Sequence, residues 1–201
     1  MKKILYSLLK KSSAFVFNIL YKIETEGLEN IPRDGKAILA ANHASFLDSM
    51  IMFPTIPRKF HAVTGKWLFK IWWLGWLFKV IDCIPTNGSS VGAIRVLEKE
   101  EMILIYPEGR CKITKEEAVG PAHKGVAIFA LKTGAPVIPI AIKGTYEAWP
   151  QTRPLPHFFK NLKVCAGRPL VFDKCSQKTI PEDLLESTLS KIMAAIHELL
   201  K

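Results

Sequence analysis

Long uncharged apolar runs are missing from this sequence, although 49% of its 201 residues are hydrophobic. A helix needs roughly 20 apolar residues to span a bilayer, whereas the longest uncharged stretch near the start covers only residues 12–21. Internal repeats and low-complexity segments are missing too. A chain of this length is therefore expected to fold as one domain with a substantial core.

Paired cysteines are also missing. The four thiols form no C-x-x-C motif and show no zinc spacing, and they stand at Cys83, Cys111, Cys165 and Cys175. This usage fits a reduced, cytoplasmic compartment with the thiols as core or surface residues. Four of the five histidines likewise show no metal-ligand spacing, and they stand at His61, His123, His157 and His197. No metal site is expected.

Acidic residues are few relative to basic ones, with 18 against 28, which gives a net charge of +10. Such a chain favours polyanions such as nucleic acids, anionic lipid headgroups or phosphorylated substrates. The sequence contains no nucleic-acid-binding motif, and its basic residues alternate with large apolar ones, which favours a lipid surface. Nucleic-acid binding remains the alternative that the charge permits, and such binding would fall steeply with salt.

Residues 1–22 contain five lysines and no acid, interspersed with leucine, isoleucine and phenylalanine. A signal peptide would begin similarly, but Lys10 and Lys11 interrupt the apolar region, and no small-residue cleavage site follows. We interpret residues 1–22 as an amphipathic membrane-associating segment and residues 23–201 as the main domain. The alternative is a helix that merely packs against the domain.

Residues 66–79 hold four of the five tryptophans, with lysines at both ends. Aromatic rings suit the headgroup level of a bilayer, where one end of the ring is dry and the other wet. We expect this segment to touch lipid or to line an acyl-chain site. A tryptophan-rich core helix is the competing interpretation, since large aromatics also dominate cores.

The remaining apolar segments alternate between strand-like and helix-like patterns, which predicts a single-domain α/β sandwich with a mixed, mostly parallel sheet flanked by helices. The expected strands cover residues 24–29, 37–41, 102–106, 135–142, 162–166 and 170–172. The expected helices cover residues 46–53, 91–99, 121–132 and 182–200. Three further local features are expected: a helix stop before Pro54, irregular or edge pairing around Pro139, and a turn at 87–89 with Ser89 capping the next helix.

The first motif with chemical potential is Asn42-His43-Ala44-Ser45-Phe46-Leu47-Asp48, directly after the strand at 37–41. Aspartate can orient a histidine and favour its cation, as in a base and its orienting group. Because five residues on one helix span about 140°, His43 and Asp48 can meet only if His43 lies in the turn and Asp48 in the first helical turn. Ser45 and Asp48 also match a purely structural capping box.

The second motif is Pro107-Glu108-Gly109-Arg110, after the strand at 102–106. Ligands of open α/β sheets gather at such strand ends. Gly109 permits close backbone approach, and the Arg110 guanidinium suits phosphate. Alone, the motif is equally compatible with a surface turn.

Together the two motifs resemble the glycerolipid acyltransferase family typified by 1-acyl-glycerol-3-phosphate acyltransferases. The resemblance spans residues 24–172 and rests on N-H-x-x-x-x-D at 42–48, Tyr-Pro-Glu-Gly-Arg at 106–110 and Val-Ile-Pro-Ile at 137–140. The sequence departs from the family pattern twice. Asn87 stands where the second family block ends in arginine, and the arginine of E-G-T-R comes one residue early, at Arg110, followed by Cys111.

The resemblance implies transfer of a fatty acyl group from acyl-CoA or an acyl carrier protein to the free hydroxyl of 1-acyl-glycerol 3-phosphate, giving phosphatidate. His43 would be the base and Asp48 its orienting group, with no covalent enzyme intermediate needed and no metal or cofactor. Glu108 and Gly109 would hold the glycerol unit and Arg110 its phosphate, while Lys66 would replace part of the charge missing at Asn87.

The same resemblance places the domain at residues 23–201 on the cytoplasmic face of a membrane, as a peripheral or monotopic enzyme. Its expected partners are an anionic membrane surface, the lysophospholipid and the acyl donor, and not nucleic acid. The alternatives are another lysolipid, glycerol 3-phosphate or dihydroxyacetone phosphate as acceptor, or a non-catalytic membrane-surface module.

Overall fold

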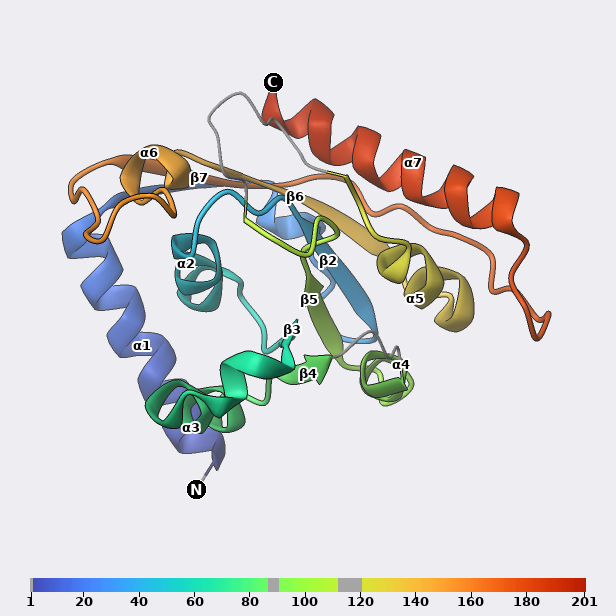
Figure 1. The fold of residues 1–201 in the computed structure, drawn as a ribbon, viewed down its shortest axis with the longest axis horizontal. Coiled ribbons are helices and arrows are strands. Elements are labelled where there is room, and N and C mark those ends of the chain that lie inside the picture. The colour runs from blue at the N-terminus through green and yellow to red at the C-terminus, as the bar shows by residue number, and fades with distance from the viewer. Residues whose placement is uncertain (1, 87–90, 112–120) are drawn as a thin grey trace.

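A seven-stranded sheet forms the centre of the protein in the computed structural model, which describes residues 2–86, 91–111 and 121–201 (Figure 1). The strands are β1 (Lys22–Glu26), β2 (Ala37–Ala41), β3 (His61–Gly65), β4 (Ile84–Thr86), β5 (Met102–Ile105), β6 (Val137–Lys143) and β7 (Asn161–Ala166). Their order is β1-β7-β6-β2-β5-β3-β4. Neighbouring strands are parallel except β6 and β7, which are antiparallel. The predicted mixed, mostly parallel sheet is confirmed.

Helices lie on both faces of this sheet (Figure 1). The α-helices are α1 (Lys2–Leu20), α2 (Leu47–Thr55), α3 (Trp72–Val80), α4 (Val91–Leu97), α5 (Gly125–Thr133), α6 (Thr145–Ala148) and α7 (Glu182–Leu200). Two short 3-10 helices are η1 (Leu28–Asn30) and η2 (Lys66–Lys70). The predicted C-terminal helix at 182–200 is confirmed with the same bounds.

The two layers follow from the alternation of side chains along β2, whose five residues are all buried. Leu39 packs in a core with Ile51 of α2, and residues of α1 pack against that core. Ile38 packs in a second core with Phe129 of α5 and Ile192 of α7. Because β2 is buried on both faces, it reads in the sequence as a continuous apolar run. The α/β sandwich is confirmed.

One expectation about proline is wrong, and of the two alternatives for Pro139 the structure shows irregular pairing and not an edge. Helix α2 does not stop before Pro54 but contains it and ends at Thr55. Pro54 has no N–H to donate to the carbonyl of Met50, so the helix loses one backbone hydrogen bond and ends one residue later. Strand β6 is an interior strand rather than an edge, since it pairs with both β2 and β7. Pro139 lies just outside the β7 pairs, where its carbonyl accepts a hydrogen bond from Gly167 N at 2.9 Å.

Most element boundaries differ from expectation by one or two residues, and three differ in a way that changes the element. The strand expected at 24–29 begins earlier, as β1, and gives way to η1. The helix expected from residue 121 begins at Gly125, although it ends as predicted with Gly134 in the left-handed conformation. The strand expected at 170–172 is reduced to one isolated bridge between Leu170 and Val137. The expected turn at 87–89, with its Ser89 cap, and Asn87 lie outside the described residues.

The N-terminal helix uses both of its faces. One side of α1 packs on the domain, where the Tyr6 and Phe53 rings meet edge to face at 5.2 Å and Lys10 Nζ donates to Ile56 O. Burial lowers the pKa of Lys10. The other side leaves large side chains exposed, including Ile4 at 75% and Phe15 at 69%. Among the described residues no helix is long and apolar enough to cross a bilayer.

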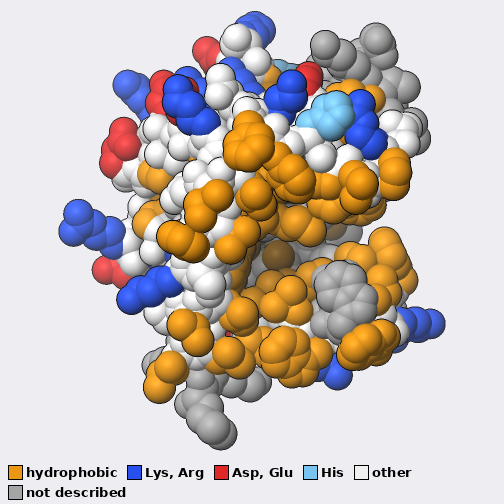
Figure 2. All heavy atoms as spheres, turned by 90° about the vertical axis from the view of Figure 1, so that its left-hand side faces the viewer, with side chains coloured by type: hydrophobic (Ala, Val, Ile, Leu, Met, Phe, Trp, Pro, Cys, Tyr) orange, Lys and Arg blue, Asp and Glu red, His pale blue; other side chains and the backbone are white. Residues whose placement is uncertain are grey.

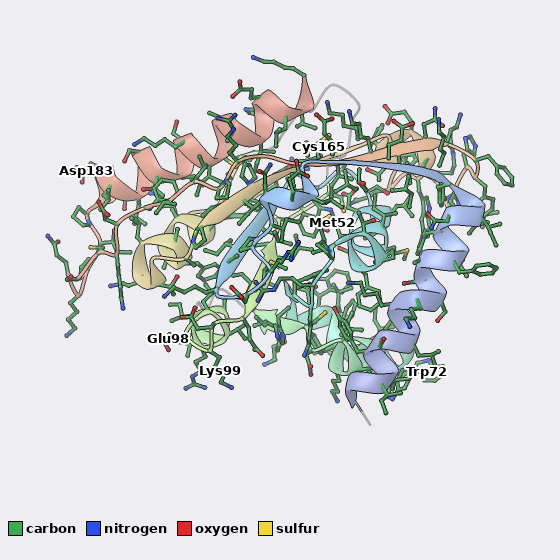
Figure 3. All side chains as sticks on the ribbon, turned by 180° about the vertical axis from the view of Figure 1, so that it is seen from behind. Met52, Trp72, Glu98, Lys99, Cys165 and Asp183 are labelled. Carbon is green, nitrogen blue, oxygen red and sulfur yellow. The ribbon has the colours of Figure 1, made fainter. Side chains whose placement is uncertain are left out.

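The tryptophan-rich segment forms η2 and α3 next to α1 (Figure 1). Trp67, Trp72 and Trp76 are 62%, 86% and 57% exposed, so the core-helix interpretation is wrong for these three side chains. Figure 2 shows hydrophobic side chains gathered around a hollow on the face where α1 and α3 lie. Figure 3 shows Trp72 at the outer edge of the molecule and Met52 of α2 inside it.

Candidate active site

The two sequence motifs lie at the same edge of the sheet. His43 follows β2 and Glu108 follows β5, and these strands are parallel neighbours with Ala40 opposite Ile105. Lys66 directly follows β3, which is the parallel neighbour of β5, so the backbone of Lys66 lies at the same edge of the sheet. Carboxyl ends of adjacent parallel strands are where open α/β sheets place their ligands. The fold therefore brings together residues 65 positions apart.

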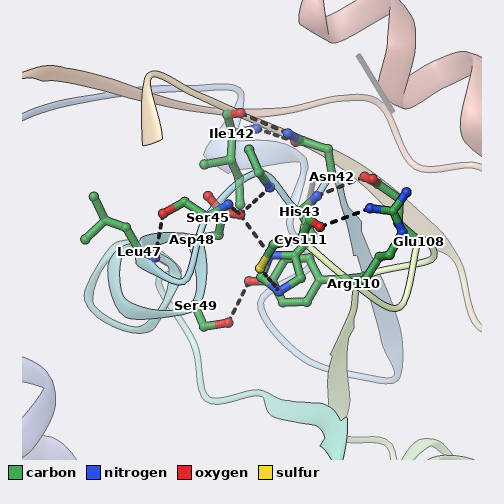
Figure 4. A network of polar contacts seen from close by, with 12 residues as sticks. Asn42, His43, Ser45, Leu47, Asp48, Ser49, Glu108, Arg110, Cys111 and Ile142 are labelled. Atoms are coloured by element: carbon green, nitrogen blue, oxygen red, sulfur yellow. Dashed lines mark hydrogen bonds and ion pairs between the residues drawn. The ribbon is translucent and has the colours of Figure 1, made fainter. Parts of the chain in front are cut away.

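His43 and Asp48 meet as the spacing required. His43 lies in the loop before α2 and Asp48 in the first turn of that helix, with His43 Nδ1 2.9 Å from Asp48 Oδ2 (Figure 4). The same carboxylate oxygen accepts the backbone N–H groups of Ala44 and Ser45 at 2.7 and 2.8 Å. The aspartate is fully buried, whereas the imidazole keeps 16% of its side-chain surface exposed. The arrangement fixes the ring with Nδ1 toward the carboxylate.

The capping interpretation is confirmed only in part, because Phe46 and not Ser45 is the N-cap of α2 and the Asp48 N–H binds the carbonyl of Ser45 rather than its hydroxyl. Ser45 Oγ accepts the N–H of Leu47 at 3.1 Å and donates to Trp149 O at 2.5 Å. Asp48 reaches back to the Ser45 N–H, as the acid of a capping box does. Asp48 thus stabilises the start of α2 and orients His43 at once, so the two interpretations do not exclude each other.

Asn42 anchors the loop to the sheet. Its Nδ2 donates to Ile142 O at 3.0 Å, and its Oδ1 accepts the Ile142 N–H at 2.7 Å. The side chain thus makes the two hydrogen bonds of a strand pair with β6. The sequence analysis placed Asn42 in the motif but gave it no role of its own; its amide holds the backbone one residue before His43.

Glu108 lies against the loop that carries the histidine. It is 4% exposed, and its Oε1 accepts the backbone N–H of His43 at 3.0 Å. Gly109 has a φ of +68°, and a Cβ there would lie 2.8 Å from Cδ2 of His123. Only glycine takes this conformation readily and leaves that space. Arg110 is exposed at the same turn, while Lys66 is exposed at the start of η2.

Two residues beside the second motif were missed by sequence reasoning. Tyr106 stacks on His43 with ring centroids 4.0 Å apart and planes at 14°, and its hydroxyl lies 3.1 Å from Ser49 Oγ. Cys111 places its Sγ 3.2 Å from His43 Nε2 (Figure 4). Both flank the Glu-Gly-Arg turn directly in sequence, which is the signal that could have found them.

The pKa of His43 reflects opposing influences. Burial alone lowers it, but the hydrogen bonds to Asp48 and Cys111 and the charges of these groups together raise it from 6.5 to about 9. The pKa of Tyr106 is raised well above its ordinary value by burial and by the Asp48 charge. The carboxylate of Asp48 and the sulfur of Cys111 thus both favour the protonated imidazole.

Groups of three or more metal-ligating side chains do not occur among the described residues. The site instead contains one oriented imidazole, whose Nδ1 contacts the buried carboxylate of Asp48 and whose Nε2 contacts the sulfur of Cys111. Such an arrangement can take up and deliver a proton. Arg110 and Lys66 add positive charge at the same sheet edge.

Comparison with known proteins gives the site a context. The family profile described as Acyltransferase matches residues 22–143. The chain is 32% identical over 139 residues to the chloroplastic 1-acyl-sn-glycerol-3-phosphate acyltransferase of Arabidopsis thaliana, covering 65% of this chain and 38% of that protein. It is 30% identical over 132 residues to the 1-acyl-sn-glycerol-3-phosphate acyltransferase of Borreliella burgdorferi, covering 62% and 52%. The chain thus spans about two fifths to one half of the length of these relatives.

The fold also matches a solved structure, that of the 1-acyl-sn-glycerophosphate acyltransferase from Thermotoga maritima. The TM-score is 0.78 with 24% identity, and the match covers 98% of this chain and 80% of that one. At this identity the likeness concerns the fold. The profile match, however, covers more than half of the chain and contains both His43 and Glu108. The chain belongs to the acyltransferase family.

Proposed function

We propose that this protein transfers a fatty acyl group from an acyl thioester to the free hydroxyl of 1-acyl-glycerol 3-phosphate, giving phosphatidate. The observation that carries the proposal is the 2.9 Å contact between His43 Nδ1 and Asp48 Oδ2 at the end of β2, inside the family match. The names of the Arabidopsis and Borreliella relatives support the choice of acceptor.

In this proposal His43 is the general base. With Nδ1–H donating to Asp48, the lone pair of a neutral imidazole lies on Nε2, the nitrogen away from the carboxylate. Nε2 accepts the proton of the acceptor hydroxyl while the oxygen attacks the thioester carbonyl. Asp48 holds the ring and stabilises the imidazolium that forms. Glu108 contributes by binding the His43 N–H at 3.0 Å, which fixes the position of the base.

Charge and close backbone approach would hold the acceptor. Arg110 is exposed beside the histidine and would bind the phosphate with its guanidinium. Lys66 would add a second positive charge from the carboxyl end of β3. Gly109 would let the glycerol unit approach the backbone, and Glu108 would hold that unit in addition to the loop. The donor is acyl-CoA or an acyl carrier protein; both are anionic and suit a chain with net charge +10.

The exposed hydrophobic side chains of α1, η2 and α3 would bring the site to its lipid substrate. Trp72 is 86% exposed and Phe15 is 69% exposed, and both lie in lysine-containing helices, α3 and α1. Aromatic and basic residues together favour an anionic bilayer surface. We therefore place the enzyme peripherally on a membrane, at its cytoplasmic face, with residues 1–22 as the membrane-associating segment.

The test is acyl transfer from a radiolabelled donor to 1-acyl-glycerol 3-phosphate in vesicles, with acyl-CoA and acyl carrier protein assayed separately. His43→Ala should lower turnover by about 10²–10⁴-fold, the contribution typical of a positioned base. His197→Ala, an exposed histidine on α7, serves as the matched control and should keep wild-type turnover. A His43→Ala enzyme with near-wild-type turnover would overturn the proposal.

A further inference from the structure

The loop between α6 and β7, residues 149–160, carries large apolar side chains on its outer surface. Leu155 is 72% exposed and Phe159 is 78% exposed, while Phe158 between them is 46% exposed. None of these three side chains belongs to a hydrophobic cluster of the core in the part of the chain that the structure describes. A single exposed apolar residue needs no explanation, but a group of them marks an interaction surface.

The backbone of this α6–β7 loop is fixed by hydrogen bonds. The His157 N–H donates to Ala148 O at 2.7 Å, and the Phe159 N–H donates to Leu20 O, also at 2.7 Å. Phe159 has a φ of +60°, in the left-handed region that a bulky residue seldom adopts. Core packing does not require this conformation, because the Phe159 side chain is largely exposed. The fold thus holds the loop in a shape that presents Phe159 to its surroundings.

The charges around the loop have one sign. Residues 148–172 contain four basic residues and no aspartate or glutamate. Two of these bases, Arg153 and Lys160, stand on either side of the apolar residues of the loop. Apolar and aromatic side chains between cations suit an anionic bilayer, because the rings enter the headgroup layer while the cations reach the phosphates. The charge therefore favours anionic phospholipid as the occupant of this surface.

The α6–β7 loop continues the exposed side of α1, on which Phe15 is 69% and Ile19 is 57% exposed. Because Leu20 accepts the Phe159 N–H, the loop lies at the C-terminal end of α1, whereas α3 lies near the N-terminal end (Figures 1 and 3). At roughly 1.5 Å per residue, α1 is about 28 Å long. Figure 2 faces this side and shows hydrophobic side chains on both sides of the hollow. Exposed aromatic residues therefore lie at both ends of α1.

We propose that the α6–β7 loop is a second membrane-contact site, which places Leu155 and Phe159 in the headgroup layer of an anionic phospholipid bilayer. The inference rests on the membrane attachment proposed above for α1, η2 and α3, and it adds a contact at the other end of α1. Two contacts separated by the length of this helix hold α1 along the bilayer surface rather than upright in it.

The loop is also joined to the catalytic residues. Ser45 Oγ donates to Trp149 O at 2.5 Å, and Trp149 Nε1 donates to Arg153 O at 3.1 Å. The Ser45 N–H is in turn accepted by Asp48, the partner of His43. A bilayer that fixes the α6–β7 loop therefore also fixes the height of His43 relative to the lipid.

The first experiment measures sedimentation with vesicles of phosphatidylglycerol and phosphatidylcholine, without acyl donor or acceptor. The double variant Leu155→Ser, Phe159→Asn should bind at least about tenfold more weakly, because two apolar side chains can no longer leave water. Asparagine tolerates the left-handed backbone, so the loop keeps its shape. Phe159→Trp keeps a large ring and should bind as wild type does. Val171→Ser, at a side chain 76% exposed between β7 and α7, is the matched control.

A second measurement reports the position of the loop in the folded, unweakened protein. Leu155→Cys is labelled with an environment-sensitive fluorophore and compared with labelled wild type, whose own thiols include the half-buried Cys83 and Cys175. Vesicles should shift the emission of the Leu155→Cys label to shorter wavelength, and lipids with a spin label near the headgroup should quench it. Labelled Val171→Cys should show neither change. An unchanged emission at residue 155 would overturn the inference.

Failure of this inference can be told apart from failure of the proposed membrane attachment by a Trp72→Ala, Trp76→Ala variant. If that variant loses vesicle binding while the Leu155, Phe159 variant does not, the attachment stands and the second contact is wrong. If wild type binds no vesicles, both are wrong. If light scattering without lipid shows a dimer that the loop variant dissociates, the surface belongs to a second copy and the inference is overturned. Weaker binding by the folded loop variant supports it, whether or not acyl transfer is detected.

Discussion

The imidazole of His43 lies flat against the ring of Tyr106, with centroids 4.0 Å apart and planes at 14°. This contact fixes the face of the ring, while Asp48 fixes its edge at 2.9 Å. Tyr106 contacts the face of the imidazole and Asp48 its edge, so together they hold the ring in one orientation. The base is positioned by packing as well as by hydrogen bonding.

The stacking contact should matter more than the tyrosine hydroxyl. Tyr106→Leu should lower turnover about threefold to tenfold, because a stacked pair is worth about 0.5–1.5 kcal/mol. Tyr106→Phe keeps the ring, loses only the contact with Ser49 Oγ, and should stay near wild type. Steady-state kinetics of the two variants provide the measurement. Equal loss in both would mean that the hydroxyl, and not the stacking, is important.

Asp48 should control the titration of His43. In wild type the imidazole should titrate near pH 9, as followed by NMR of labelled histidine. Asp48→Asn removes the charge that raises the pKa of His43, so the titration should move to lower pH and turnover should fall by roughly 10²-fold or more. An unchanged titration would show that another group sets the charge of His43.

The raised pKa of His43 should also appear in stability. A pKa above its unfolded value of 6.5 means that the folded state binds the proton more tightly. This contribution, roughly 3 kcal/mol, is fully present below pH 6.5 and is lost as the pH rises through about 9. Denaturant unfolding of wild type and His43→Gln should give a stability difference that shrinks over this interval. A stability difference that stays constant with pH would show that the pKa of His43 is not raised in the folded state.

Glu108 should be needed as an acceptor rather than as a charge. Glu108→Ala leaves the partly buried His43 N–H without this partner, which costs about 1–3 kcal/mol of unfolding free energy. Glu108→Gln can keep that hydrogen bond through its amide oxygen and should lose less. Thermal and denaturant unfolding of the two variants provide the measurement. A Glu108→Gln protein less stable than Glu108→Ala would reject this role.

The exposed tryptophans should govern attachment to lipid. The double variant Trp72→Ala, Trp76→Ala should bind vesicles of phosphatidylglycerol and phosphatidylcholine at least about tenfold more weakly, because each lost ring removes apolar area that could leave water. Val171→Ala, which alters a side chain 76% exposed between β7 and α7, is the control. Sedimentation with vesicles measures both, and unchanged binding of the folded double variant would rule out the membrane role of this segment.

The sequence was most informative where a single physical cause dominates. A strand buried on both faces needs an unbroken apolar run, so residues 37–41 were predicted correctly, as was the sandwich built around them. The His43–Asp48 pair could be predicted because helical geometry allows their contact in only one arrangement. Helix α7 was predictable from its amphipathic pattern and from Pro181 before it.

Long-range partners were not predictable in this way. Nothing local reveals that Cys111 meets His43 from 68 positions away, or that the Asn42 amide pairs with Ile142. Pro139 predicted either a sheet edge or irregular pairing, and only the register shows that the strand is interior and that the missing N–H falls beyond the last pair with β7. These contacts depend on strand order, which a single sequence does not display.

The short loop from Asn42 to Asp48 is held at both ends and in the middle. The side chain of Asn42 hydrogen-bonds to β6, and Glu108 accepts the His43 N–H. Asp48 accepts the N–H groups of Ala44 and Ser45. The conformational entropy of this loop is therefore lost during folding, before any substrate arrives. Binding of the proposed lipid acceptor and acyl donor does not have to order this loop, so more of the interaction energy is left to lower the barrier of the reaction.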